Sequence, residues 1–544
     1  MKRVCDSKES CLRFHHPSTR HAGTVLLVVG FAFLHTFAAS TEKKPSPGCA
    51  LARPYITGAQ AALTLGDPES ALQKLDRAVQ ISPQCAEAHL RLALVQFQTG
   101  AIAASIEHYQ HALKLQPRSY SARYNLALAF LRQHKLREAR TQLEQAVRVD
   151  PHQPDAAYDL GVTLLELGEP ATALIHLRRA RTLTPQRPDV AFNIVRAELE
   201  AGKISQARTE AQLSVKRFAG DFQWLAATGQ LFLKNKQPAD AAVYLRRANL
   251  LRPDDAETRR QLSMAYLQCR QPEQVLNTLT DPKTPEDHYL LGSAYYIADR
   301  FPEADKESDA AMSLAPEDPR ILVLRTRLLQ RAGQQDDALR LAQKVTTLAP
   351  QWDEPYYLAG VSSYFIRRYD QAEQNLARAI ELNPKSPQAL FLQSIALGNL
   401  GKIDDAERAL RRALELQPNS ARLHCHLGIL LMRRNETLEA QNSFRRSIQL
   451  KPDYALPHYE LAKLLVREKQ LQPAAHELEQ ATAHDPGLTA AYYQLSRVYA
   501  KLGQTEESKR VLKQFEKLSR EELHDPRAGD QELEEDTRRA TEAP

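Results

Sequence analysis

Hydrophobic residues recur along most of this chain with the spacing of amphipathic helices. In one stretch, Leu90, Leu94 and Phe97 fall on one face and predict the buried side of a first helix. Gly100 is expected to end that helix in the left-handed conformation that glycine adopts cheaply. A second apolar-periodic helix then runs to Pro117, which stops it because proline has no N–H to donate. The pattern predicts a helix–turn–helix unit.

This unit repeats along the chain with a period of about 34 residues. Eleven prolines follow the second helices in step, and ten of them fall into two runs that keep this period: Pro83, Pro117, Pro151 and Pro185, then Pro253, then Pro316, Pro350, Pro384, Pro418, Pro452 and Pro486. A fixed period of this length indicates stacked units that share one continuous core. We expect 14 units, which start near residues 52, 86, 120, 154, 188, 222, 256, 285, 319, 353, 387, 421, 455 and 489.

Small residues recur where the two helices of a unit must approach closely, as at Ala93, Gly161 and Gly428. Together with the period and the terminal proline, they make residues 52–522 resemble the tetratricopeptide repeat family. The resemblance implies an all-α, right-handed superhelical solenoid whose first helices line a concave face. The repeats are similar to those of O-linked N-acetylglucosamine transferases. Only residues 523–544 follow the last unit, so the resemblance is to the repeats without the catalytic domain.

Two units depart from the pattern. The fifth has Ala219 and Gly220 where proline is expected, and Gly220 is predicted to supply the helix stop. The seventh is short and runs only from Ala256 to Thr284, because its second helix, expected over 272–280, lacks more than a turn. The sequence therefore predicts an irregular twist there and a division of the array into residues 52–284 and 285–522.

Residues 1–40 are predicted to be a signal peptide or an uncleaved membrane anchor. Residues 22–39 are apolar and follow five basic residues, and Ala38, Ala39 and Ser40 offer a cleavage site. Either alternative places the repeats outside the cytoplasm, in the periplasm, secreted or tethered to a membrane. A buried helix or an incorrectly chosen start codon is the remaining interpretation. Residues 41–51 are expected to be a linker, and the charged tail at 523–544 is expected to be disordered.

The fifth position of the first helix is often aromatic. Eight of the fourteen units carry a ring there, although only 7% of the chain is aromatic. One interpretation is a ladder of anchors for an extended peptide or a partner helix, and the other is packing between adjacent first helices. Basic residues gather late in the array and suit either an acidic partner or a solvated face: Arg433, Lys463, Arg467, Arg497 and Lys501. The ladder consists of Tyr124, Tyr158, Phe192, Tyr289, Tyr357, Phe391, Tyr459 and Tyr493.

Signatures of enzymatic chemistry are missing from the sequence. It has none of the usual phosphate-binding, zinc-protease or serine-hydrolase motifs, and a net charge of +6 over 544 residues gives no case for nucleic acid. His108 and His111, and His424 and His426, are spaced for accidental metal binding, but scattered histidines explain them better. We expect no catalytic residues, no metal and no cofactor.

Cys49 and Cys85 are the best candidates for a disulfide, because each precedes the first helix of one of two neighbouring units. Two free thiols are the alternative.

These features predict a non-enzymatic scaffold of the cell envelope or secretory space that binds protein partners. An assembly factor or accessory subunit of an envelope transferase or secretion complex is the alternative function.

Overall fold

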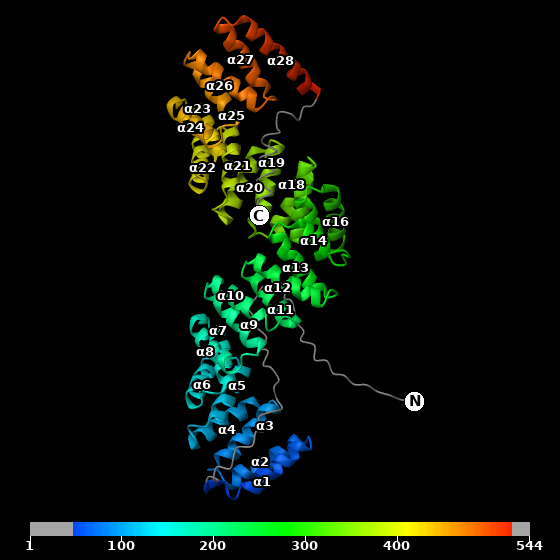
Figure 1. The fold of residues 1–544 in the computed structure, drawn as a ribbon, viewed down its shortest axis with the longest axis vertical. Helices are drawn as coiled ribbons and strands as arrows, with labels where there is room; N and C mark the ends of the chain where they lie inside the picture. The colour runs from blue at the N-terminus through cyan, green and yellow to red at the C-terminus, as the bar shows by residue number, and fades with distance from the viewer. Residues whose placement is uncertain (1–46, 525–544) are drawn as a thin grey trace, which may run out of the picture. The chain divides into compact units, whose positions relative to one another are not determined.

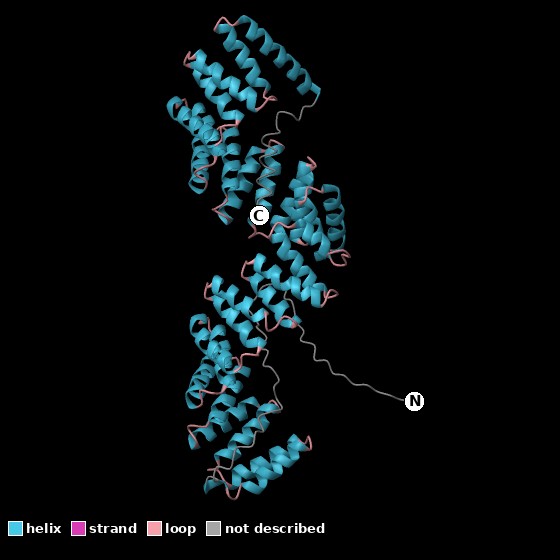
Figure 2. Cartoon of the chain, in the orientation of Figure 1, coloured by secondary structure: helices cyan, strands magenta, loops and turns pink. Residues whose placement is uncertain are grey.

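The computed structural model describes residues 47–524, whose regular structure is entirely helical (Figure 1, Figure 2). This part of the chain has 28 α-helices and one short 3-10 helix, and no strand. The helices alternate as first and second members of helix–turn–helix pairs. The predicted fold class, an all-α superhelical repeat fold, is confirmed.

The contacts divide the chain into two compact units between Ala156 and Ala157. The sequence also predicts a division near residue 284. That position lies inside the second compact unit, and the predicted division there stays a prediction. The first compact unit contains η1 (Pro47–Cys49), α1 (Arg53–Thr64), α2 (Pro68–Ile81), α3 (Ala86–Gln98), α4 (Ile102–Leu115), α5 (Tyr120–Arg132), α6 (Leu136–Val149) and the start of α7 (Pro154–Glu166).

The second compact unit continues the same alternation. Its first helices after α7 are α9 (Pro188–Glu200), α11 (Phe222–Lys234), α13 (Ala256–Gln268), α15 (Pro285–Ile297), α17 (Pro319–Arg331), α19 (Asp353–Phe365), α21 (Pro387–Asn399), α23 (Ala421–Arg433), α25 (Ala455–Arg467) and α27 (Thr489–Lys501). Its second helices are α8 (Pro170–Leu183), α10 (Ile204–Val215), α12 (Pro238–Leu251), α14 (Pro272–Thr278), α16 (Phe301–Leu314), α18 (Gln335–Leu348), α20 (Tyr369–Leu382), α22 (Ile403–Leu416), α24 (Thr437–Leu450), α26 (Leu471–His484) and α28 (Thr505–His524).

A small residue on the first helix faces a large one on the second in several regular pairs. At Gly428, an added Cβ would lie 2.5 Å from the ring of Phe444, which is fully buried. Gly161 faces Leu177 and Gly360 faces Leu376 at similarly short distances. Packing at this density leaves no room for a further methyl group, so the small residue sets how closely the two helices cross.

The turns between paired helices use residues with a left-handed backbone, and only some of these residues are glycine. Gly100 has φ 89°, as predicted, while His134, Arg367 and Asn435 adopt φ of 55°, 61° and 64° at equivalent turns. A non-glycine residue in this region costs about 1–2 kcal/mol. The helix pairing therefore overrides a local backbone preference at several units.

The fifth repeat corrects one prediction. Helix α10 ends at Val215, well before Gly220, and the backbone of Gly220 is not left-handed. Instead, Phe218 turns into the core, where it is 8% exposed and its ring centroid lies 5.5 Å from that of Trp224. Burial of Phe218 redirects the chain, so Gly220 does not supply the helix stop.

The seventh repeat has the short second helix that its length indicates. Helix α14 spans seven residues, while α12 and α16 span 14. Helix α13 contacts the next first helix, α15. The carboxylate of Asp287, 6% exposed, accepts hydrogen bonds from the backbone N–H groups of Lys283 (3.1 Å) and Thr284 (3.0 Å). The predicted irregularity in twist stays a prediction.

Substituting Gly428→Ala is expected to lower the free energy of unfolding by about 1–3 kcal/mol, because the new methyl group meets the rigid ring of Phe444. Urea unfolding followed by circular dichroism measures this change. Gly398→Ala is the matched control, since its Cβ would meet nothing closer than 3.5 Å and alanine favours a helix. Equal stability of the two variants would contradict the close-crossing interpretation.

Candidate functional site

The first helices form the more closely packed layer of the second compact unit. Successive first helices contact one another: α9 with α11, α11 with α13, α13 with α15, α15 with α17, α17 with α19, α19 with α21, and α23 with α25. Between residues 157 and 524, successive second helices do not pack this closely. Side chains that project from the first helices, away from the second, therefore share one surface, which we call the inner face.

Seven of the predicted ladder residues lie on first helices of this layer, and Tyr124 lies on the first helix α5 of the first compact unit. Their exposure differs. Phe391 is buried, at 5%, and Tyr493 is exposed, at 41%. The remaining six, Tyr124, Tyr158, Phe192, Tyr289, Tyr357 and Tyr459, are half-buried. Half-buried rings can pack against a neighbouring helix and still present an edge to a ligand, so the arrangement is compatible with both interpretations.

Arginines from the following unit cover several ladder rings. The guanidinium carbon of Arg187 lies 4.5 Å from the ring centroid of Tyr158, that of Arg320 lies 5.3 Å from Tyr289, and that of Arg422 lies 4.0 Å from Phe391. All three distances are in the range of cation–π attraction. The sequence pattern does not single out these arginines, because they come from the start of the next first helix and the contact is not visible along one helix.

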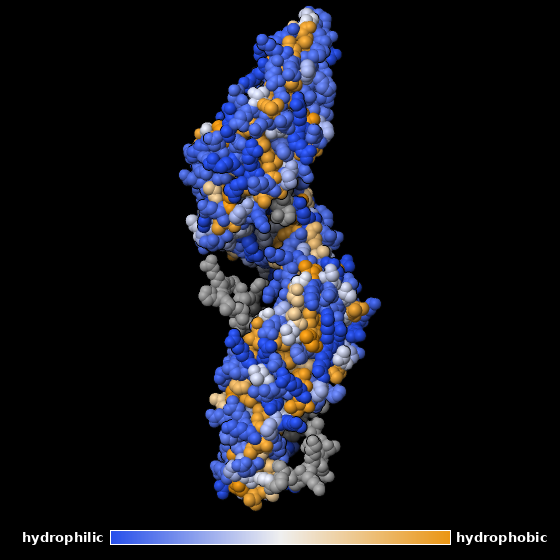
Figure 3. Space-filling view, turned by 90° about the vertical axis from the view of Figure 1, so that its left-hand side faces the viewer, coloured by the Kyte–Doolittle hydropathy of each residue, from blue (hydrophilic) through white to orange (hydrophobic). Residues whose placement is uncertain are grey.

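Cations on the same helix cover the last two rings. The ammonium nitrogen of Lys463 lies 5.1 Å from the ring of Tyr459, and the guanidinium carbon of Arg497 lies 5.6 Å from the ring of Tyr493. Both belong to the basic residues that gather late in the array. The inner face therefore combines aromatic rings with cations along its length, and Figure 3 shows hydrophilic residues interspersed with separate apolar patches on one face of the molecule.

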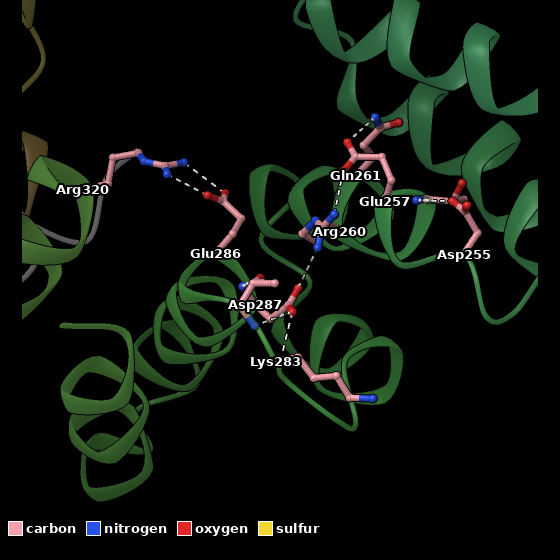
Figure 4. A network of polar contacts seen from close by, with 10 residues as sticks. Asp255, Glu257, Arg260, Gln261, Lys283, Glu286, Asp287 and Arg320 are labelled. Atoms are coloured by element: carbon pink, nitrogen blue, oxygen red, sulfur yellow. Dashed lines mark hydrogen bonds and ion pairs between the residues drawn. The ribbon is translucent and has the colours of Figure 1, made fainter. Parts of the chain in front are cut away.

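Carboxylates neutralise the cations in the middle of the array. Arg320 binds Glu286 (Nη2–Oε2, 2.6 Å) and Asp318 (Nη2–Oδ2, 2.8 Å), and the hydrogen bond that Arg320 donates to Asp318 is the main cause that raises the pKa of Arg320. Arg260, which replaces an aromatic ring at the ladder position, binds Glu257 at 2.8 Å and lies 3.8 Å from Asp287 (Figure 4).

A cluster of rings and one cation surrounds His426 on α23. The ring centroids of His426 and Phe391 are 4.8 Å apart in an edge-on arrangement. Burial, with a contribution from the charge of Arg422, lowers the pKa of His426 to about 3. Burial also raises the pKa of Tyr357 to about 12. Both side chains are therefore neutral at physiological pH and offer uncharged donors and acceptors next to Arg422.

The first compact unit contains two further features. Cys49 and Cys85 form a disulfide with a Cα–Cα distance of 4.8 Å, which is one of the two alternatives that the sequence left open. His108, which the sequence singled out, lies with its Nδ1 3.0 Å from Nδ1 of His89. The ring of His89 stacks on His111 at a centroid distance of 5.3 Å. Over residues 47–524, no cluster of three or more His, Cys, Asp or Glu side chains is arranged to hold a metal.

None of the helices within residues 47–524 combines the length and apolar character that crossing a membrane requires. The predicted signal or anchor at residues 22–39 lies outside the described residues, and so does the predicted tail beyond His524.

Models of the tetratricopeptide repeat match residues 56–120, 124–188, 192–256, 367–425 and 465–521, which together make up more than half of the chain. The chain belongs to the tetratricopeptide repeat family. Members of this family act as protein-interaction scaffolds, and their repeats present extended surfaces. The narrower likeness to the repeats of O-linked N-acetylglucosamine transferases stays a prediction.

Curated relatives match only part of this chain. An Hsp70-Hsp90 organizing protein of Triticum aestivum is 23% identical over 155 residues, which cover 28% of this chain and 26% of the relative. Hsp70-Hsp90 organizing protein 3 of Arabidopsis thaliana is 25% identical over 108 residues, 20% of this chain and 19% of the relative. The chain thus spans about a quarter or less of the length of these relatives.

Matches to solved structures cover more of this chain, but at low sequence identity and low TM-score. A chain of the APC/C hetero-tetramer Cut9-Hcn1 is 14% identical, with 83% of this chain and 97% of that chain covered and a TM-score of 0.41. Yeast Tom70 is 16% identical, with coverages of 84% and 96% and a TM-score of 0.34. At this similarity, neither structure bears on function.

Replacing His426 is expected to reduce the acid sensitivity of the fold. The pKa of His426 is about 3 in the folded chain and about 6.5 in an unfolded one. The unfolded state therefore binds the extra proton first, and stability is lost as the pH falls below about 6.5. Between pH 7 and pH 5 the wild type should lose about 1–2 kcal/mol more than His426→Gln.

Urea unfolding at both pH values measures this difference. His424→Gln, on the same helix, is the control and should lose as much stability as the wild type. If His426→Gln is as acid-sensitive as the wild type, burial does not keep His426 neutral in the folded chain.

Proposed function

We propose that this protein is a non-enzymatic scaffold that binds extended segments or helices of partner proteins along the inner face. One observation carries the proposal: at the spacing of the repeat, first helices present half-exposed aromatic rings, and cations lie over several of them. Aromatic and arginine side chains dominate the binding energy of protein interfaces. A surface that repeats them in register suits a ligand longer than one unit.

The physical character of the inner face supports an extended protein ligand. Its rings are held by packing between helices, so little side-chain entropy is lost when a ligand arrives. The ion pairs of Arg320 and Arg260 keep much of the face near neutrality, which favours a polypeptide of mixed character over nucleic acid. Shape and charge would be matched over several units, and no single pocket would dominate.

The proposal includes a location outside the cytoplasm. A disulfide between Cys49 and Cys85 suits an oxidising compartment. The apolar run at residues 22–39, preceded by basic residues, has the composition of an export signal or anchor. Protein partners would then be envelope or secreted proteins.

Replacing Tyr158, Tyr289, Tyr357 and Tyr459 together by alanine is expected to reduce partner binding at least tenfold, because each truncation removes about 1–2 kcal/mol of contact with a ligand that lies along the inner face of the second compact unit. Affinity capture followed by mass spectrometry identifies partners of the wild type. Titration of one purified partner against both proteins then gives the ratio of Kd values.

The matched control replaces Tyr356 by alanine. Tyr356 neighbours Tyr357 on α19 but faces Arg378 on α20, with its ring centroid 5.9 Å from the guanidinium carbon. Circular dichroism must show that both variants remain helical. Unchanged partner affinity in the folded ladder variant would refute the inner face as the binding surface.

A further inference from the structure

A row of cations without carboxylate partners among the described residues lies on the first helices near the C-terminal end of the array. The row consists of Arg433 on α23, Arg467 on α25, and Arg497 and Lys501 on α27, and all four side chains are exposed. We call these four residues the basic row. Arg433, Arg467 and Lys501 lie one repeat period apart, so they occupy the same register of three successive units.

The hydrogen bonds and the ring contact of the basic row hold its side chains along the helices but do not neutralise their charge. Arg433 donates to the carbonyl oxygen of Gly398 (2.9 Å), and Arg467 donates to Oδ1 of Asn435 (3.1 Å), so each reaches back to the preceding unit. Arg497 lies over the ring of Tyr493. The neighbouring carboxylate of Glu468 accepts hydrogen bonds from Gln441 and Gln470 instead.

Cations at the ninth position of the unit, which Arg497 occupies, are paired elsewhere in the second compact unit. Arg196 occupies the ninth position of its unit, as Arg497 does, and binds Glu166 at 2.9 Å and Glu200 at 2.8 Å. Arg327, also at the ninth position, binds Glu354. Lys463 binds Glu460 at 2.7 Å and is therefore left out of the basic row. At the ninth position, Arg497 is therefore the cation without a carboxylate partner among the described residues.

The residues that follow the last helix carry the opposite charge. Residues 525–544 hold seven acidic and three basic side chains, and four of the five residues at 532–536 (ELEED) are acidic. Opposite charges of this density attract over about one Debye length, roughly 8–10 Å at physiological salt. The chain therefore contains its own complement to the basic row.

The acidic run can reach the nearer members of the basic row. Helix α28 spans 20 residues and packs against α27, and at 1.5 Å per residue its far end lies about 30 Å from the turn beside Lys501. The chain from His524 to residues 534–536, fully extended, spans about 33–40 Å. Arg497 and Lys501 on α27 are within that range, and Arg467 occupies the register of Lys501 one unit earlier.

We propose that the acidic segment at residues 532–536 binds the basic row through Arg467, Arg497 and Lys501, and thereby covers the C-terminal end of the inner face. An acidic segment of a partner must then displace the tail before it binds there. Tethering gives the tail an effective concentration of about 1 mM, so even a weak contact is occupied most of the time. This inference concerns a contact within one chain and does not rest on the proposed function.

The test uses a fluorescein-labelled peptide of residues 525–544 as the probe. Fluorescence anisotropy measures its binding to the full chain, to a truncation that ends at His524, and to the truncation with Arg467, Arg497 and Lys501 all replaced by glutamine. The matched control neutralises three exposed, ion-paired arginines on second helices, Arg208, Arg340 and Arg408. A peptide with Glu532, Glu534, Glu535 and Asp536 changed to amides controls for the acidic run.

We expect the truncation to bind the peptide with a Kd of tens of micromolar, and the Kd to rise at least fivefold in about 0.5 M NaCl. The full chain should bind about tenfold more weakly, because its own tail occupies the site. The row variant and the amide peptide should each lose at least tenfold in affinity, while the control variant should bind like the truncation.

Three results would each overturn the proposal. They are an absence of peptide binding by the truncation, binding by the row variant as tight as that by the control variant, and equal binding by the full chain and the truncation. Circular dichroism of every variant separates a lost contact from a lost fold.

Discussion

The close crossing of the two helices in each unit is the constraint on which the rest of the structure depends. Gly161, Gly360 and Gly428 each admit a large side chain from the second helix at a distance that leaves no space for a methyl group. This contact fixes the geometry of one helix pair. Because other units have the same geometry, their pairs stack, and the first helices of successive units come into contact. Side chains at one position of the unit are thereby placed in a row.

Electrostatics then differentiates a surface that packing alone would make uniform. In the middle of the array, arginines that lie over aromatic rings are also bound by carboxylates, as Arg320 is by Glu286 and Asp318. Towards the end, Arg467 and Lys501 have no such partner within the described residues. A repetitive fold can thus carry regions of different charge, because charge is set by exposed residues that the core does not constrain.

The sequence predicts the repeat well because period, small residues and helix stops all express one packing solution. It fails where tertiary contacts decide: the fifth second helix ends at Val215 because Phe218 is buried, whereas the sequence pattern favoured Gly220. Arg422 was missed as a neighbour of Phe391, since contacts between units are not visible along one helix. The pairing of Cys49 with Cys85 depended on two helix ends meeting within 4.8 Å, which spacing alone leaves open.

Photo-cross-linking tests most directly whether the first helices carry the binding surface. A photoreactive phenylalanine analogue at Tyr357, on the inner face, is compared with the same analogue at Leu438, which is 71% exposed on second helix α24. With a purified partner present, the account predicts cross-links to the partner from position 357 and only background from position 438. Cross-links from position 438, with none from position 357, would contradict it.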